Sequence, residues 1–318
     1  MSISSVATDV TGAYPRERLA TNTVTSTPAN SNSSELAKRV GVALVGVPLL
    51  LWVFWKGDAA LATVLAAMSA ISAFEFMRIA RVGGTNPLSV MGVVLAALVP
   101  IAVHAQFLRV VNIPNVVAVL VMLAVVAASI WARGVNGKPL SAAAVTLFGV
   151  AYTGGTLSFA YALRYFGYAV GDTSGALVLI LPVALTWASD TGAYFAGRAF
   201  KGPKLIPSVS PAKTISGSIG GVFLTIVVCL LFVKYSLRPY AQLAFTPWGA
   251  ILFAVGISAA AQTGDLVESL YKREAGVKDS GTLLPGHGGA LDRFDSLFFV
   301  LPVAYALYWA LLIPAPTA

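Results

Sequence analysis

Nine long apolar segments constrain the fold of this chain more than any other feature of its sequence. They span residues 40–55, 59–77, 88–107, 114–132, 140–163, 174–190, 217–236, 245–263 and 296–314. Most approach the ~20 residues that an α-helix needs to cross a hydrocarbon core about 30 Å thick. The segments are continuous rather than alternating, and they are too long for barrel strands. We therefore expect an all-α, polytopic integral membrane protein with about nine transmembrane helices.

The composition excludes several other classes of protein. Only 11% of the 318 residues are charged, whereas an average soluble domain carries about 25%. Such a chain cannot coat a water-exposed surface, which argues against a soluble enzyme, a disordered protein or a coiled coil. We attribute the net charge of +8 to loops near anionic lipid, and we expect no nucleic-acid partner. The single Cys229 permits no intramolecular disulfide, and two histidines exclude a multi-histidine metal site.

The two ends of the chain differ in character. Residues 1–37 are rich in Ser, Thr and Asn and show no apolar period, which predicts a disordered cytoplasmic tail rather than a secretory signal. Residues 38–318 are expected to form a single transmembrane domain. In its sixth apolar segment, Pro182 and the terminal Asp190 predict a kinked or broken helix.

The distribution of basic residues predicts the orientation. With the N-terminus inside, the inner segments hold 16 of the 21 Lys and Arg residues. The outer segments hold the other five, Lys56, Arg109, Arg164, Lys234 and Arg238. Because cytoplasmic loops carry an excess of Lys and Arg, we expect an N-in, C-out topology.

Charge concentrates in two of the predicted inner loops, residues 190–214 and 265–295. These 56 residues carry 15 of the 34 charges and seven of the 13 acids. Loops between membrane helices are polar because water surrounds them, and that simple interpretation stays open. It does not account for a glycine-rich stretch at 285–289 or for acids at the mouths of helices. We therefore place the catalytic region at about 186–296.

The acids of this region predict a magnesium site. Asp190, Asp265 and Asp292 come from three different helix ends on the same predicted membrane side. Ionisable groups at such positions are costly and usually functional, and oxygen ligands suit Mg²⁺ rather than zinc. Asp295 shares a helical face with Asp292 at a spacing of three. If the preceding helix continues, Asp265, Ser269 and Lys272 also lie on one face.

The basic residues beside these acids predict a phosphate site. They are Lys213, Lys272, Arg273, Lys278 and Arg293, whose side chains donate hydrogen bonds to phosphate oxygens. The stretch around His287, Gly288 and Gly289 has little side-chain bulk, so its backbone N–H groups can approach an anion closely. Acids for a divalent ion beside bases for phosphates are typical of phosphoryl or nucleotidyl transfer. There is no P-loop sequence.

Residues 269–295 read Ser-Leu-Tyr-Lys-Arg-x4-Lys-Asp-x5-Pro-Gly-His-Gly-Gly-x2-Asp-Arg-x-Asp. This spacing closely resembles the signature of the CDP-diacylglycerol synthases (phosphatidate cytidylyltransferases). Residues 190–198, 262–266 and 210–217 are also similar to that family, whereas the N-terminal helices match only in hydropathy and rough count. Tyr271 and Ala290 replace aliphatic residues. Ser216 stands where the family motif carries Glu, so the role of that Glu cannot be assigned here.

The resemblance implies transfer of CMP from CTP to phosphatidic acid, giving CDP-diacylglycerol and pyrophosphate for phospholipid biosynthesis. It implies Mg²⁺, with a second cation and a homodimer left open, and an active site on the cytoplasmic face of a bacterial-type inner membrane. The implied catalytic residues are Lys213, Lys272, Arg273, Lys278, Asp279, His287, Arg293 and Asp295. The implied substrate contacts are Ser210, Ser269, Gly288 and Gly289, and the implied metal ligands are Asp190, Asp265 and Asp292.

Two alternatives stay open. A related lipid-phosphate transferase, such as a polyprenol kinase, would release a nucleoside diphosphate rather than pyrophosphate. An ion-coupled transporter would use the Asp cluster as a cation site, with acids near the middle of the membrane in broken helices and often with internal repeats. The sequence shows no repeat by eye.

Overall fold

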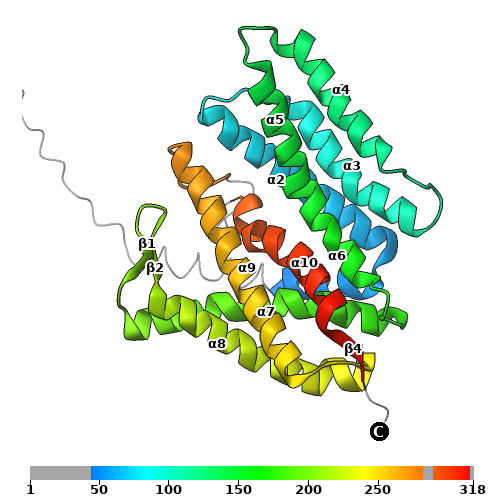
Figure 1. The fold of residues 1–318 in the computed structure, drawn as a ribbon, viewed down its shortest axis with the longest axis vertical. Coiled ribbons are helices and arrows are strands. Elements are labelled where there is room, and N and C mark those ends of the chain that lie inside the picture. Colours follow the sequence, from blue (N-terminus) through cyan, green and yellow to red (C-terminus); the bar gives the residue numbers. More distant parts are fainter. Residues whose placement is uncertain (1–43, 282–288, 316–318) are drawn as a thin grey trace, which may run out of the picture.

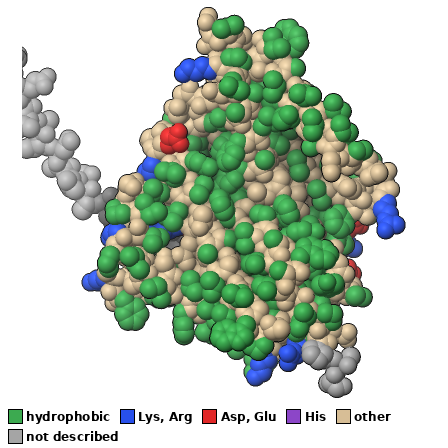
Figure 2. Space-filling model, viewed as in Figure 1, with side chains coloured by type: hydrophobic (Ala, Val, Ile, Leu, Met, Phe, Trp, Pro, Cys, Tyr) green, Lys and Arg blue, Asp and Glu red, His purple; other side chains and the backbone are tan. Residues whose placement is uncertain are grey.

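The computed structural model describes residues 44–281 and 289–315, and these residues form a bundle of helices (Figure 1). In this described part of the chain, eight helical segments are long and apolar enough to cross a membrane, and the shorter apolar helix Leu44–Lys56 precedes them. Hydrophobic side chains cover most of the face in Figure 2, with charged groups mainly at its margins. The prediction of an all-α polytopic protein is confirmed, and within the described residues the first of the nine predicted segments forms only that shorter helix. The tail predicted at 1–37 lies outside the described residues.

In chain order, the elements after Leu44–Lys56 are α2 (Asp58–Val82), α3 (Ser89–Phe107), α4 (Val116–Arg133), α5 (Pro139–Val150), η1 (Ala151–Gly155), α6 (Thr156–Arg164), α7 (Gly171–Phe200), β1 (Lys204–Ile206), β2 (Ser210–Thr214), α8 (Ile215–Phe232), η2 (Val233–Ala241), β3 (Leu243–Phe245), α9 (Pro247–Glu274), α10 (Leu291–Leu311) and β4 (Leu312–Pro314). The π-helical turn η1 joins α5 and α6 into one span, Pro139–Arg164, and η2 extends α8 into the span Ile215–Ala241. The described strands form only two short antiparallel pairs, β1–β2 and β3–β4.

Glycines let the helices of the C-terminal half approach one another closely. A Cβ atom at Gly192 of α7 would lie 2.5 Å from the carbonyl oxygen of Gly220 on α8. A Cβ atom at Gly264 of α9 would lie 2.6 Å from the carbonyl oxygen of Asp295 on α10. Real Cβ atoms do not come so near, so only glycine permits these crossings. Three of these helices, α7, α9 and α10, carry the acids singled out in the sequence.

Of the two outcomes predicted at Pro182, a kinked or a broken helix, the break does not occur, because α7 runs without interruption from Gly171 to Phe200. Proline leaves the carbonyl four residues earlier, that of Val178, without its helical donor. The Tyr308 hydroxyl of α10 donates to that carbonyl at 2.9 Å. In addition, the Thr186 hydroxyl donates to the Pro182 carbonyl at 2.9 Å. Neighbouring helices and Thr side chains commonly satisfy such freed groups in membrane proteins.

The predicted helix-end positions are wrong for Asp190 and Asp265, whereas Asp292 lies in the first turn of α10 as predicted. Asp190 lies inside α7, which continues to Phe200, and Asp265 lies inside α9, which continues to Glu274. Apolar composition ends where lipid contact ends, whereas the backbone hydrogen bonds of a helix continue into polar residues. The continuation of α9 confirms that Asp265 and Ser269 share a face, and the Ser269 hydroxyl donates to Asp265 Oδ1 at 3.4 Å.

Candidate active site

The junction between β2 and α8 fixes the position of Lys213. Thr214 is the N-cap of α8, and its hydroxyl oxygen accepts a hydrogen bond from the Gly217 backbone N–H at 3.1 Å. Such a cap satisfies one of the free N–H groups at a helix start. A Cβ atom at Gly197 of α7 would lie 2.9 Å from the Thr214 hydroxyl oxygen. The cap and the neighbouring glycine therefore hold Lys213 beside the N-terminus of α8 and close to α7.

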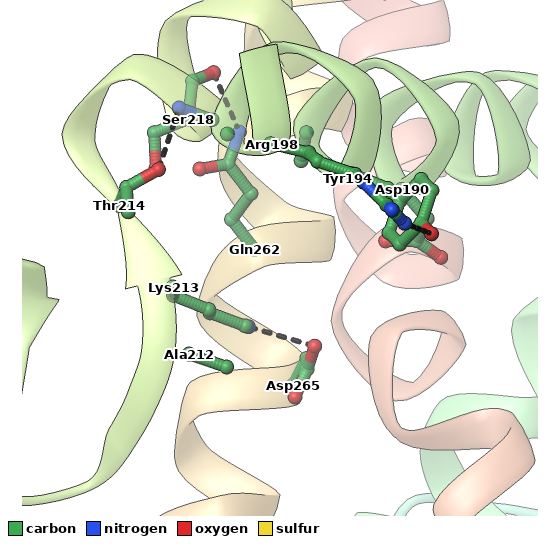
Figure 3. Close-up of a pocket in the computed structure, with 12 residues that line it drawn as sticks. Asp190, Tyr194, Arg198, Ala212, Lys213, Thr214, Ser218, Gln262 and Asp265 are labelled. Carbon is green, nitrogen blue, oxygen red and sulfur yellow. Dashed lines mark hydrogen bonds and ion pairs between the residues drawn. The ribbon is translucent and has the colours of Figure 1, made fainter. Parts of the chain in front are cut away.

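A pocket of about 470 Å³ lies between α7, the β2–α8 junction and α9 (Figure 3). Its polar lining includes Asp190, Tyr194 and Arg198 from α7, Lys213, Thr214 and Ser218 from the junction, and Gln262 and Asp265 from α9. The Lys213 Nζ atom lies 2.7 Å from Asp265 Oδ2, and their side chains are 26% and 34% exposed. This ion pair is therefore within reach of a ligand that enters the pocket.

Asp190 and Asp265 give this pocket two carboxylates from different helices. Asp295 of α10 does not line this pocket, and its backbone carbonyl lies against Gly264 of α9. Within residues 44–281 and 289–315, no three or more His, Cys, Asp or Glu side chains form a group that could hold a metal. Magnesium is usually bound through one or two carboxylates, with waters and substrate phosphates as the other ligands. Asp190 and Asp265 fit such a site.

Asp292 lies in a second cluster. Its Oδ1 atom accepts a hydrogen bond from Lys272 Nζ at 2.8 Å. Its Oδ2 atom accepts from the backbone N–H groups of Ser280 at 3.1 Å and Gly289 at 3.0 Å. Lys272 Nζ also lies 2.6 Å from Glu268 Oε2. These contacts occupy the Asp292 carboxylate, which does not line the pocket of Asp190, and its metal role stays a prediction.

The other predicted residues are more scattered. Arg273 donates to the Val277 carbonyl at 3.3 Å, beyond the end of α9. Ser210 pairs with Ile206 in the β1–β2 hairpin and does not line the pocket. Lys278, Asp279 and Arg293 are exposed, while His287 and Gly288 lie outside the described residues. The structure therefore brings together Asp190, Lys213 and Asp265, with Ser269 beside them, and separately Lys272, Asp292 and Gly289.

Sequence reasoning did not assign site roles to three side chains of the pocket. Arg198 donates to the Tyr194 hydroxyl at 3.0 Å. Both residues lie on the same face of α7 as Asp190, because the three positions are spaced by four, and all three line the pocket. The Gln262 amide donates to the Ser218 carbonyl at 3.3 Å. Arg198 and Gln262 lie in stretches that resemble the family, which is a usable signal. Tyr194 lies in the same family-like stretch as Arg198, residues 190–198.

Ser216 lies outside this pocket. Its hydroxyl donates to the Lys201 carbonyl and lies 3.1 Å from the Thr214 hydroxyl oxygen. It lines instead an apolar groove along α7 and α8, together with Phe200 and Phe223. The departure from the family motif therefore changes a contact with the turn after α7, and not the carboxylates or the lysine of the pocket.

Fold and site together define a polytopic membrane protein with a polar pocket of paired acids and a lysine among its C-terminal helices. The sequence profile of the Cytidylyltransferase family matches residues 37–311, so the chain belongs to that family.

Curated relatives show the same relationship over a shorter region. The chain is 41% identical over 161 residues to a phosphatidate cytidylyltransferase of Staphylococcus epidermidis, covering 51% of this chain and 57% of that protein. It is 43% identical over 164 residues to one of Staphylococcus aureus, with the same coverage of 51% and 57%. It is 42% identical over 150 residues to one of Haemophilus influenzae, covering 47% and 52%. The chain thus spans little more than half the length of the curated relatives that it matches.

Proposed function

We propose that the chain is a phosphatidate cytidylyltransferase. An oxygen of the phosphatidic acid phosphate attacks the α-phosphorus of CTP and forms the new P–O bond. The bond from the α-phosphorus to the bridging oxygen of the β-phosphate breaks, and pyrophosphate leaves. The lipid phosphate is already an oxyanion, so the reaction needs no strong general base. Repulsion between the two polyanions is the main obstacle, and the basic groups of the pocket address it.

The observation that carries this proposal is the pairing of Lys213 with Asp265 in a pocket that also holds Asp190. The N-terminus of α8 faces the same pocket through Gly217 and Ser218. A helix N-terminus favours phosphate, because its N–H groups are free and its dipole is positive there. A cation, a helix N-terminus and paired carboxylates are the groups that a metal–triphosphate complex needs.

Asp190 and Asp265 would hold Mg²⁺, which when bound offsets the charge of the triphosphate and polarises its phosphoryl oxygens. The Lys213 ammonium group lies 2.7 Å from Asp265 Oδ2, beside that position. It would stabilise the charge that develops on the pyrophosphate as it leaves. Arg198, held by its bond to the Tyr194 hydroxyl, is a second donor for phosphate oxygens at the same pocket.

We place this pocket on the cytoplasmic face of a bacterial inner membrane, where CTP has access. The support is the excess of Lys and Arg on the inner segments of an N-in, C-out chain. Single cysteines test it, because the native Cys229 is fully buried. An impermeant maleimide should label Val110→Cys in intact cells and Val135→Cys only after permeabilisation, since these side chains are 73% and 93% exposed. The reverse pattern would refute the orientation.

One assay separates the proposed function from its alternatives. Detergent-purified protein is incubated with labelled CTP, phosphatidic acid and Mg²⁺, and the products are separated. We expect CDP-diacylglycerol and pyrophosphate. Release of CDP with phosphorylation of a polyprenol would indicate the lipid kinase instead. If no product forms while a known phosphatidate cytidylyltransferase is active under the same conditions, the proposal is refuted. The transporter alternative is not favoured, because Asp190 and Asp265 lie in continuous helices rather than broken ones.

A further inference from the structure

Glu75 is a buried acid in the N-terminal half of the chain. It lies on α2 within an apolar stretch, and only 3% of the residue is exposed. A carboxylate at such a position is costly and needs partners, so intramembrane acids are usually functional. Its partners come from the far end of the chain, more than 200 residues away in the sequence.

The Glu75 carboxylate binds residues on both sides of the segment 282–288. Its Oε2 atom accepts a hydrogen bond from the Leu291 backbone N–H at 2.7 Å. The same atom accepts a hydrogen bond from the Ser280 hydroxyl at 3.1 Å. Leu291 is the first residue of α10, and a negative charge is favourable at a helix N-terminus. Glu75 therefore ties α2 to the start of α10 and to the residues that follow α9.

The space around this carboxylate is closed by glycines. A Cβ atom at Gly281 would lie 2.4 Å from Glu75 Oε1, and one at Gly289 would lie 2.6 Å from Oε2. Side chains at these positions would push the carboxylate away from Ser280 and Leu291. Two glycines of the 269–295 signature region are thus fitted to Glu75, a residue outside that region.

The residues that Glu75 binds also hold Asp292. The Ser280 backbone N–H donates to Asp292 Oδ2, and Leu291 directly precedes Asp292 in the chain. Asp292 in turn accepts from Lys272 Nζ at 2.8 Å. We propose that Glu75 is a positioning residue of the transfer reaction, which fixes Ser280 and Leu291 so that Asp292 and Lys272 keep their mutual orientation. This inference rests on the proposed function.

The test compares kcat and KM of three variants with those of the wild type. Glu75→Ala removes the acceptor and should lower kcat by between about 10-fold and 100-fold, as misplacement of reacting groups does. KM for CTP should change by less than about twofold, since Glu75 does not line the substrate pocket. Glu75→Gln keeps one oxygen acceptor and should restore part of kcat. Ser72→Ala, at a buried serine on the same helix, is the matched control and should keep wild-type kcat.

A mutant cycle with Ser280→Ala separates positioning from a general loss of stability. If Ser280 and Glu75 act through their hydrogen bond, the double variant should be no slower than Glu75→Ala alone. Folded Glu75→Ala or Glu75→Gln protein with wild-type kcat would overturn the inference. A double variant whose loss in kcat equals the product of the two single losses would also overturn it. If Glu75→Ala does not fold, the kcat values of Glu75→Gln and Ser280→Ala test the inference in its place.

A second measurement needs no catalysis. Hydrogen–deuterium exchange at the Leu291 amide should be faster in Glu75→Gln than in the wild type, because its acceptor is weakened. Unchanged exchange would overturn the inference. An inactive wild type with the expected change in exchange would instead count against the proposed function alone.

Discussion

The Tyr308 hydroxyl of α10 donates a 2.9 Å hydrogen bond to the Val178 carbonyl of α7. Val178 is four residues before Pro182, so its carbonyl is the one that proline leaves without a donor inside the helix. Tyr308 is fully buried, so water cannot replace its hydroxyl. This contact lets α7 continue to the turns that carry Asp190 and Arg198.

We predict that Tyr308→Phe destabilises the protein without removing any group of the pocket. The change leaves the Val178 carbonyl buried and unpaired, which costs about 1–3 kcal/mol. Thermal unfolding in detergent should show a lower Tm than for the wild type. Tyr305→Phe, at a partly exposed tyrosine of the same helix, is the control. A Tm as high as that of Tyr305→Phe would show that the Val178 contact contributes nothing.

Apolar segments predicted the type of the membrane helices and the places of the eight spans seen in the described residues, because lipid contact requires a run of about 20 apolar residues. They did not predict where α7 and α9 end. Both helices continue past the apolar run, to Phe200 and Glu274. The carbonyl that Pro182 frees inside α7 is bound by Tyr308, which is 130 residues away from it in the chain. No local pattern reports a contact of that kind.

The site was predictable in its residue types and only partly in its pairings. Sequence spacing within one helix placed Asp265 with Ser269, and the structure confirms it. The pairing of Lys213 with Asp265 joins β2 to α9, and no spacing rule predicts it. Glu75 was visible as a lone acid in an apolar segment, but its partners lie in the last part of the chain.

Lys213→Gln should lower kcat by about 10²–10³-fold, which is the usual loss when one group that stabilises transition-state charge is removed. The variant keeps a polar side chain that is one atom shorter and loses its charge, so Asp265 also loses its ion pair. Lys204→Gln is the matched control, because Lys204 is an exposed lysine opposite Thr214 in the same hairpin. We expect the control to keep near-normal turnover of CTP into CDP-diacylglycerol. Equal rates for both variants would refute the role of Lys213.

Asp265→Asn and Asp292→Asn should each abolish turnover while the protein still inserts, but for different reasons. Asp265 lines the pocket beside Asp190, so its loss should weaken Mg²⁺ binding, and excess Mg²⁺ should recover part of the rate. Asp292 is bound by Lys272, Ser280 and Gly289, so excess Mg²⁺ should not recover its variant.

Rates measured over a range of Mg²⁺ concentrations distinguish these cases. Equal rescue of both variants would assign Asp292 to the metal, as the sequence predicted. If both variants kept near-normal rates, neither carboxylate would hold the ion. Asp172→Asn is a suitable control, because Asp172 pairs with Arg164 at the other end of α7.

Ser216→Ala should keep turnover within about twofold of the wild type and lower stability by no more than about 1 kcal/mol. The variant loses the two hydrogen bonds of a partly buried hydroxyl, one to the Lys201 carbonyl and one shared with the Thr214 hydroxyl. It leaves the Thr214 cap and the Lys213–Asp265 pair in place. Initial rates at saturating CTP and Tm in detergent measure the two effects. A loss of more than tenfold in rate with an unchanged Tm would show that Ser216 has a catalytic role of its own.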